Sequence, residues 1–221
     1  METPDYKLIR ARRKTLALEV LKDATLVVKA PYSLSIEYIN KFIEQKQTWI
    51  WKKQKYIRER SVPSRQYING ERFLFLGETY SLTVIEESFP PLAFANGFFL
   101  SRHHLENAQQ IFGDWYRDQA LQKISLRVEH YATKLGINYN RIRISNAQSR
   151  WGSCTRPSNL SFSWRLAMAP LPIIDYVVVH ELVHILEHNH SQRFWQRVRQ
   201  AYPEYKTCRQ WLKENAHRLV I

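Results

Sequence analysis

Cysteine, glycine, methionine and long apolar runs are all scarce in this chain. Its 221 residues include two cysteines, six glycines and two methionines. Two cysteines cannot build the disulfide framework of a small secreted domain, so the thiols of Cys154 and Cys208 are expected to be reduced. The N-terminus lacks the apolar segment of a signal peptide, and no apolar stretch has the length of a membrane-spanning helix. We therefore expect a cytoplasmic protein without a membrane segment.

Acidic side chains are also in the minority. The chain has 20 Asp and Glu against 33 Lys and Arg, which gives a net charge of +13. Residues 1–65 carry 15 basic and 7 acidic side chains, and residues 191–221 carry 7 and 2, whereas the middle is nearly neutral. Basic termini are typical of proteins that bind nucleic acid or another polyanion. The alternative is a solvated basic surface, because no aromatic–basic repeat accompanies the charge.

The most informative pattern is His-Glu-Leu-Val-His at residues 180–184. Two histidines four residues apart project from one face of a helix, about one turn apart. That spacing lets both imidazoles bind one Zn²⁺, and it places the intervening Glu to take a proton from a zinc-bound water. The sequence therefore predicts a catalytic zinc site with His180 and His184 as ligands and Glu181 as the general base.

The surrounding segment predicts that this motif lies on a buried helix. Residues 173–186 are apolar almost all round, and Pro170 and Pro172 are suited to a helix start. A buried helix keeps a stripe of ionisable groups only where they are paired, bind metal or face a cleft. The alternative is a core helix whose histidines are hydrogen-bonded to their neighbours.

A catalytic zinc needs a third protein ligand and one open position. His190, six residues after His184, can supply that ligand if the chain turns back, and Ser191 resembles the N-cap of a new helix at this turn. His188 is the alternative third ligand. A continued helix would carry His188 along the axis and away from the metal, which favours His190.

The fold class is predicted to be α+β, with a boundary between residues 102 and 103. The expected N-terminal region, 1–102, is rich in β-strands and contains one long helix over 35–60, capped by Ser35. Its expected strands are 6–12, 15–21, 25–29, 73–76, 80–85, 92–94 and 98–100.

Residues 103–221 are expected to form the catalytic domain. The pattern predicts a helix over 105–135 ended by Gly136, a strand over 138–145 and a polar loop over 148–155. A strand over 160–168 leads into the motif helix, and two helices, 191–201 and 205–218, follow it.

Several motifs of the C-terminal half together resemble the YgjP-like metallopeptidase family. They are Arg-Trp-Gly-Ser-Cys at 150–154, Ser-Trp-Arg-Leu at 163–166, Ala-Pro at 169–170, the segment 174–184, and Asn-His-Ser-Gln-Arg-Phe-Trp at 189–195. The resemblance is close from near residue 105 to the end and looser before it. The SprT-like, DNA-linked metalloproteases are more distantly similar. The resemblance implies a zincin-like catalytic domain, with His180, His184 and His190 as zinc ligands and Glu181 as the catalytic residue.

The favoured hypothesis is hydrolysis of a peptide or protein substrate by a zinc-activated water. The strand over 160–168 is expected to be the edge of the cleft and to pair with an extended peptide. Arg150 and Arg165 are candidates for binding a substrate carboxylate or an oxyanion, and each is alternatively part of a structural ion pair. Trp151 is expected to be a packing anchor and Cys154 a small buried residue.

Two other functions remain open at this point. The same zinc-bound water could attack the phosphoanhydride bond of a nucleotide. Against this, the chain has no glycine-rich phosphate loop and few extra carboxylates for a second metal. A nucleic-acid-associated protease is motivated by the basic termini. A purely structural zinc is disfavoured, because such sites usually have four ligands rich in cysteine.

Overall fold

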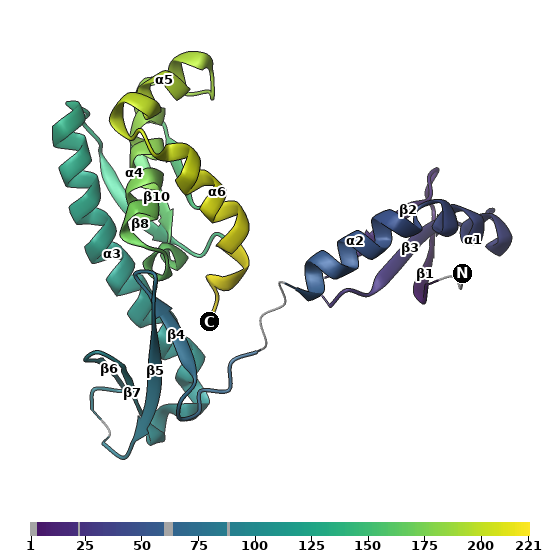
Figure 1. Ribbon diagram of the computed structural model, residues 1–221, viewed down its shortest axis with the longest axis horizontal. Coiled ribbons are helices and arrows are strands. Elements are labelled where there is room, and N and C mark those ends of the chain that lie inside the picture. Colours follow the sequence, from purple (N-terminus) through teal and green to yellow (C-terminus); the bar gives the residue numbers. More distant parts are fainter. Residues whose placement is uncertain (1–3, 22, 60–63, 88) are drawn as a thin grey trace. The chain divides into compact units, whose positions relative to one another are not determined.

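The computed structural model describes residues 4–21, 23–59, 64–87 and 89–221. In these residues the chain forms six α-helices and three small β-sheets, consistent with the predicted α+β class (Figure 1). The chain divides into two units, Met1–Pro63 and Ser64–Ile221, each with its own core. The division therefore lies earlier in the chain than the predicted boundary between residues 102 and 103.

The first unit contains a three-stranded sheet where three strands were predicted. Its strands are β1 (Tyr6–Ala11), β2 (Ala17–Val20) and β3 (Leu26–Pro31). The order is β1-β3-β2, with β1 parallel and β2 antiparallel to β3. The central strand β3 is the most buried, as expected for a strand with partners on both edges.

Two helices cover residues 36–58, where one long helix was predicted. They are α1 (Ile36–Gln45), which Ser35 caps by accepting a hydrogen bond from the Tyr38 amide, and α2 (Gln47–Arg58). The prediction of a single helix was wrong because Lys46 leaves the helical conformation, at φ −102° and ψ 5°. Both halves keep helical spacing of apolar residues, so the pattern alone does not reveal the break. Ile39, Ile43 and Ile50 pack with the buried face of β3.

The second unit begins with a four-stranded sheet. Its strands are β4 (Arg72–Phe75), β5 (Glu78–Ile85), β6 (Leu92–Phe94) and β7 (Phe98–Ser101), in the order β4-β5-β7-β6. Neighbouring strands are antiparallel except β5 and β7, which are parallel.

The long helix α3 (Ala108–Leu135) explains why this sheet belongs to the second unit. A 3₁₀ turn (Arg102–Asn107) leads into it, and Gly136 ends it in the left-handed conformation, as predicted. Phe112 of α3 stacks on Phe73 of β4 at 4.4 Å between ring centroids and lies 5.2 Å from Phe98 of β7. These aromatic contacts join residues 64–101 to the C-terminal half in one hydrophobic core.

A second sheet in this unit has the order β8-β10-β9, formed by β8 (Arg141–Ser145), β9 (Gly152–Thr155) and β10 (Asn159–Ser163). β10 is parallel to β8 and antiparallel to β9. The strand predicted over 160–168 is therefore the central strand, and its second half is a 3₁₀ turn (Trp164–Met168). The predicted cleft edge is corrected: the edge strands of this sheet are β8 and β9, and β9 lies in a segment expected to be a polar loop.

Three helices complete the second unit: α4 (Leu171–Leu186), α5 (Gln192–Ala201) and α6 (Tyr205–Asn215), with a final 3₁₀ turn (Ala216–Arg218). The turn between β4 and β5 is tied to the segment before α4, because the amides of Leu76 and Gly77 donate to the carbonyls of Ala167 and Met168. In the part of the chain described here, none of the helices has the length and apolarity that a bilayer span requires.

Candidate metal centre

The motif segment lies on α4, a helix buried over most of its length. Pro170 occupies the N-cap position and Pro172 the first turn, as the sequence predicted. Fully or nearly fully buried residues include Ile174, Val178 and Leu182. Packing in the core therefore fixes the rotation of α4 about its own axis. This rotation determines where the side chains of residues 180, 181 and 184 point.

An ion pair anchors the start of α4. Asp175 is 8% exposed, accepts a hydrogen bond from Arg127 Nη2 at 2.8 Å, and accepts another from the Tyr131 hydroxyl at 3.3 Å. The pairing with Asp175 raises the pKa of Arg127.

We expect Asp175→Asn to lower the free energy of unfolding by about 1–3 kcal/mol, because Arg127 loses a charged partner in a largely buried site. Asp114→Asn is the matched control: Asp114 pairs with Arg117 on the same helix as Arg127, but its side chain is 57% exposed. Its loss is expected to cost under about 1 kcal/mol. Urea unfolding of both variants measures the difference, and equal effects would contradict the anchoring role.

Three histidine side chains converge at the C-terminal half of α4. His190 Nε2 lies 3.1 Å from His180 Nε2 and 3.2 Å from His184 Nε2. These three nitrogens form a group of possible metal ligands, all within 4.8 Å of one another. Within the described residues, His188 is exposed and does not belong to that group.

The start of α5 positions the His190 ring next to His180 and His184. Ser191 accepts a hydrogen bond from the Phe194 amide, which is the predicted N-cap, and Asn189 Oδ1 accepts one from the Ser191 amide. The ring of Trp195 stacks on His190 at 5.6 Å between centroids, with an interplanar angle of 22°. The capped turn and the stacked ring hold the His190 ring over the face of α4.

The donor set fits a zinc ion. His184 Nδ1 lies 3.1 Å from the Glu187 carbonyl oxygen, which can only accept, so Nδ1 carries the proton and Nε2 presents its lone pair. Burial, with the neighbouring His184 and His190, lowers the pKa of His180 to about 3 and keeps that ring neutral. Zn–N bonds of about 2.0–2.1 Å in tetrahedral geometry separate ligand atoms by about 3.3 Å. The two separations from His190 Nε2, 3.1 and 3.2 Å, are close to this value.

Glu181 lies beside the histidine group in a nearly closed environment. The residue is 5% exposed. Burial raises the pKa of its carboxyl to about 8, and the charge of Arg150 opposes that rise. A carboxyl poised near neutral pH is suited to accepting and returning a proton.

Gly152 of β9 makes room for this carboxylate. A β-carbon at residue 152 would lie 2.5 Å from Glu181 Oε1 and 2.6 Å from Glu181 Cγ. Only glycine allows the backbone of β9 to approach the Glu181 side chain this closely. Gly152 was not among the predicted site residues, although it lies in the segment 150–154 that resembles the metallopeptidase family.

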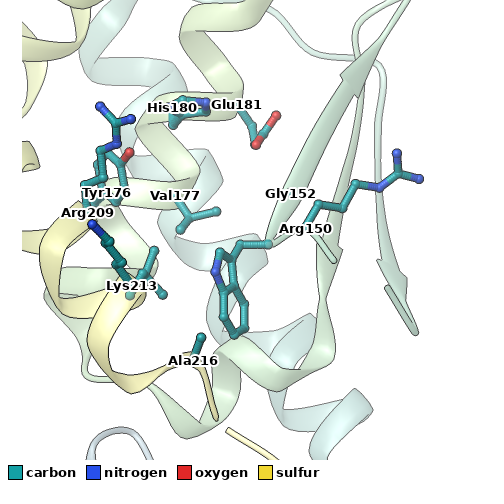
Figure 2. A pocket seen from close by; sticks show the side chains of 11 residues that line it. Arg150, Gly152, Tyr176, Val177, His180, Glu181, Arg209, Lys213 and Ala216 are labelled. Atoms are coloured by element: carbon teal, nitrogen blue, oxygen red, sulfur yellow. The ribbon is translucent and has the colours of Figure 1, made fainter. Parts of the chain in front are cut away.

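A pocket of about 420 Å³ opens next to His180 and Glu181 (Figure 2). Arg150 lines it, and Figure 2 shows its side chain extending past Gly152 and away from His180. Trp151 lines the pocket and packs against the core, whereas Cys154 is half-buried. Arg165 lies elsewhere: it lines a different pocket, stacks on the Trp164 ring at 4.4 Å and donates to the Asn146 carbonyl. The geometry therefore groups Arg150 with the site and Arg165 apart from it.

Comparison with known proteins gives one family match. The model of the YgjP-like, metallopeptidase domain matches residues 14–215. None of the curated proteins matches the chain significantly. Among solved structures, the metallopeptidase zymogen of Pyrococcus abyssi abylysin is similar at 19% identity, with a TM-score of 0.38, over 41% of this chain and 93% of that chain.

Proposed function

Because the chain belongs to the YgjP-like metallopeptidase family, we propose that it is a zinc-dependent peptidase with a zincin-like catalytic domain. His180, His184 and His190 are the proposed zinc ligands, and Glu181 is the proposed general base. The observation that carries the proposal is the convergence of three Nε2 atoms beside a buried carboxylate. Three protein ligands leave one position open, as a catalytic site requires.

The protein residues supply binding, orientation and proton transfer. When bound, zinc would polarise the scissile carbonyl and make its water more acidic. Glu181 accepts the water proton at its carboxylate and later returns it to the leaving nitrogen. Burial by Gly152 and α4 excludes bulk water from that carboxylate, and the charge of Arg150, which lines the same pocket, opposes the rise in its pKa.

An extended peptide can bind along β9. Among the strands that the structure describes, β9 pairs only with β10, so no strand occupies its other edge. The Ser163 amide donates to the Trp151 carbonyl, and bonded and non-bonded pairs alternate in an antiparallel ladder. The backbone groups of Gly152 and Cys154 therefore point outward, toward a peptide added as a new strand. The strand places the peptide next to Glu181, because Gly152 contacts that side chain.

Hydrolysis by the zinc-loaded protein tests the proposal directly. A mixture of unstructured peptides, analysed by mass spectrometry, should show new termini that depend on added zinc and disappear with Glu181→Gln. Nucleoside triphosphates in a parallel reaction test the phosphoanhydride alternative. Phosphate release without peptide cleavage would replace the peptidase proposal.

The N-terminal unit carries side chains suited to nucleic acid, which motivates a second partner. Trp51 is 58% exposed on α2, and Lys55 Nζ lies 5.1 Å from its ring centroid. Exposed aromatic rings next to cations bind single-stranded nucleic acid by stacking and charge. We expect binding of single-stranded oligonucleotides to weaken steeply with salt. Trp51→Ala should weaken it by about 1–3 kcal/mol.

Tyr32→Ala is the control for that measurement, since Tyr32 is 71% exposed on the same unit but lies in the turn before α1. Fluorescence anisotropy at several salt concentrations gives both affinities. Equal affinities of the two variants, or no binding at low salt, would remove nucleic acid as a partner of this surface.

A further inference from the structure

The pocket next to Glu181 has an apolar wall and a basic side. Its volume, about 420 Å³, far exceeds that of one water molecule, about 30 Å³, so it can admit a whole side chain. The apolar lining comes from α4, α6, the 3₁₀ turn after α6 and the segment before β9: Val177, Leu212, Ala216 and Trp151. The aliphatic part of a substrate side chain would pack against these residues.

Two cations line the other side. Arg209 and Lys213 are four residues apart on α6, so they lie on one face of that helix. Figure 2 shows both side chains extending from α6 along the same side of the pocket, next to Tyr176. The Arg209 guanidinium is steadied by the Trp195 ring, 5.2 Å from its centroid.

The two cations have no protein carboxylate as a partner among the described residues. Glu181 is the one acidic residue in the pocket lining there. Like charges four residues apart on a helix repel each other. An anionic ligand between them would relieve that repulsion and gain charge-assisted hydrogen bonds.

We propose that this pocket is a substrate subsite for a carboxylate, with Arg209 and Lys213 as its specificity-determining residues. The inference rests on the proposed peptidase function and names its substrate class: peptides with a carboxylate-bearing residue next to the scissile bond. Asp and Glu side chains and the C-terminal carboxylate share this chemistry. A Lys or Arg side chain is repelled by the same two charges, and a neutral side chain leaves them unpaired.

A series of peptides that differ only in the position of one Glu tests the subsite. One Glu is moved through the positions on both sides of a scissile bond, with Gln at the same place as the matched peptide. Each sequence is made with a free and with an amidated C-terminus, which separates side-chain from terminal recognition. At one position the zinc-loaded protein should show a kcat/KM ratio of Glu over Gln of about 10- to 100-fold, the range expected for a hydrogen bond to a charged group.

The variants connect this preference to the pocket. Arg209→Gln with Lys213→Gln should bring the ratio close to one. Lys213→Glu should do the same, because the introduced carboxylate would pair with Arg209 one helical turn away. Lys206→Gln, an exposed position of α6 outside the pocket lining, is the control and should keep the parent ratio. A purely structural role of the two cations would lower cleavage of all peptides alike and leave the ratio unchanged.

A binding measurement separates this inference from the peptidase proposal. Acetyl-Glu-amide and acetyl-Gln-amide are titrated into the zinc-loaded protein while the Trp151 indole N–H signal is followed by NMR, assigned with Trp151→Phe. Selective binding of the Glu compound without peptide cleavage would support the subsite and reject the peptidase. Cleavage with a Glu-over-Gln kcat/KM ratio of one at every position would overturn the subsite alone. Binding of inorganic triphosphate in place of the Glu compound would also overturn it.

Discussion

Replacing Glu181 by Gln is expected to lower kcat for peptide hydrolysis by about 10²- to 10⁴-fold, the usual contribution of a positioned general base. Gln keeps the size of the side chain but cannot accept the water proton. Because the proposed ligands are the three histidines, zinc content should stay at the parent level. The measurement is kcat with a cleaved peptide at saturating concentration, with zinc content determined on the same sample.

Glu187→Gln is the matched control for that experiment. Glu187 lies six residues further along, just past the last turn of α4, where its carboxylate pairs with Arg197 at 3.5 Å. Its contact with His184 uses the backbone carbonyl, which the substitution leaves in place. We expect activity close to that of the parent. Comparable losses in the two variants would reject Glu181 as the base.

Gly152→Ala is expected to reduce hydrolysis by at least about 100-fold, the scale of a catalytic group that has been misplaced. The new methyl group would meet Glu181 at 2.5 Å, so the carboxylate has to move out of its position. Overpacking of a buried contact also costs stability, by about 1–3 kcal/mol. Kinetics and urea unfolding of the same preparation measure both effects.

A double-mutant cycle shows whether the clash is with Glu181. In a Glu181→Ala background the space is free, so Gly152→Ala should cost little stability there. Gly113→Ala on α3 is the control, since its β-carbon would meet no atom closer than 3.5 Å and alanine favours a helix. An equal cost of Gly152→Ala in both backgrounds would show that Glu181 is not the residue displaced.

The core of the site could be predicted because its signals are local. The spacing of His180, Glu181 and His184 is that of one face of a helix. Ser191 is typical of a helix N-cap, which predicts a turn beside His190. Gly152 could not be predicted in the same way. Its contact with Glu181 joins a strand to a helix about 30 residues away, and no periodicity in the sequence describes such an approach.

The predicted and observed folds differ for the same reason: contacts between residues distant in sequence are not visible in local patterns. β9 looks like a loop because Gly152–Thr155 has no alternation of apolar and polar residues, and its pairing with β10 decides its conformation. Strands β4–β7 look like part of the N-terminal half, but Phe73 and Phe98 pack on Phe112 of α3. Local propensity indicates the elements, whereas contacts distant in sequence decide which of them share a core.

The zinc content of three purified proteins tests the central claim most directly: the parent, His190→Ala and His188→Ala, each with its folded state verified by circular dichroism. The account predicts about one zinc per chain in the parent and in His188→Ala, and a strong loss in His190→Ala, because His190 Nε2 completes the ligand group and His188 does not belong to it among the described residues. A folded parent without zinc, or a loss confined to His188→Ala, would contradict it.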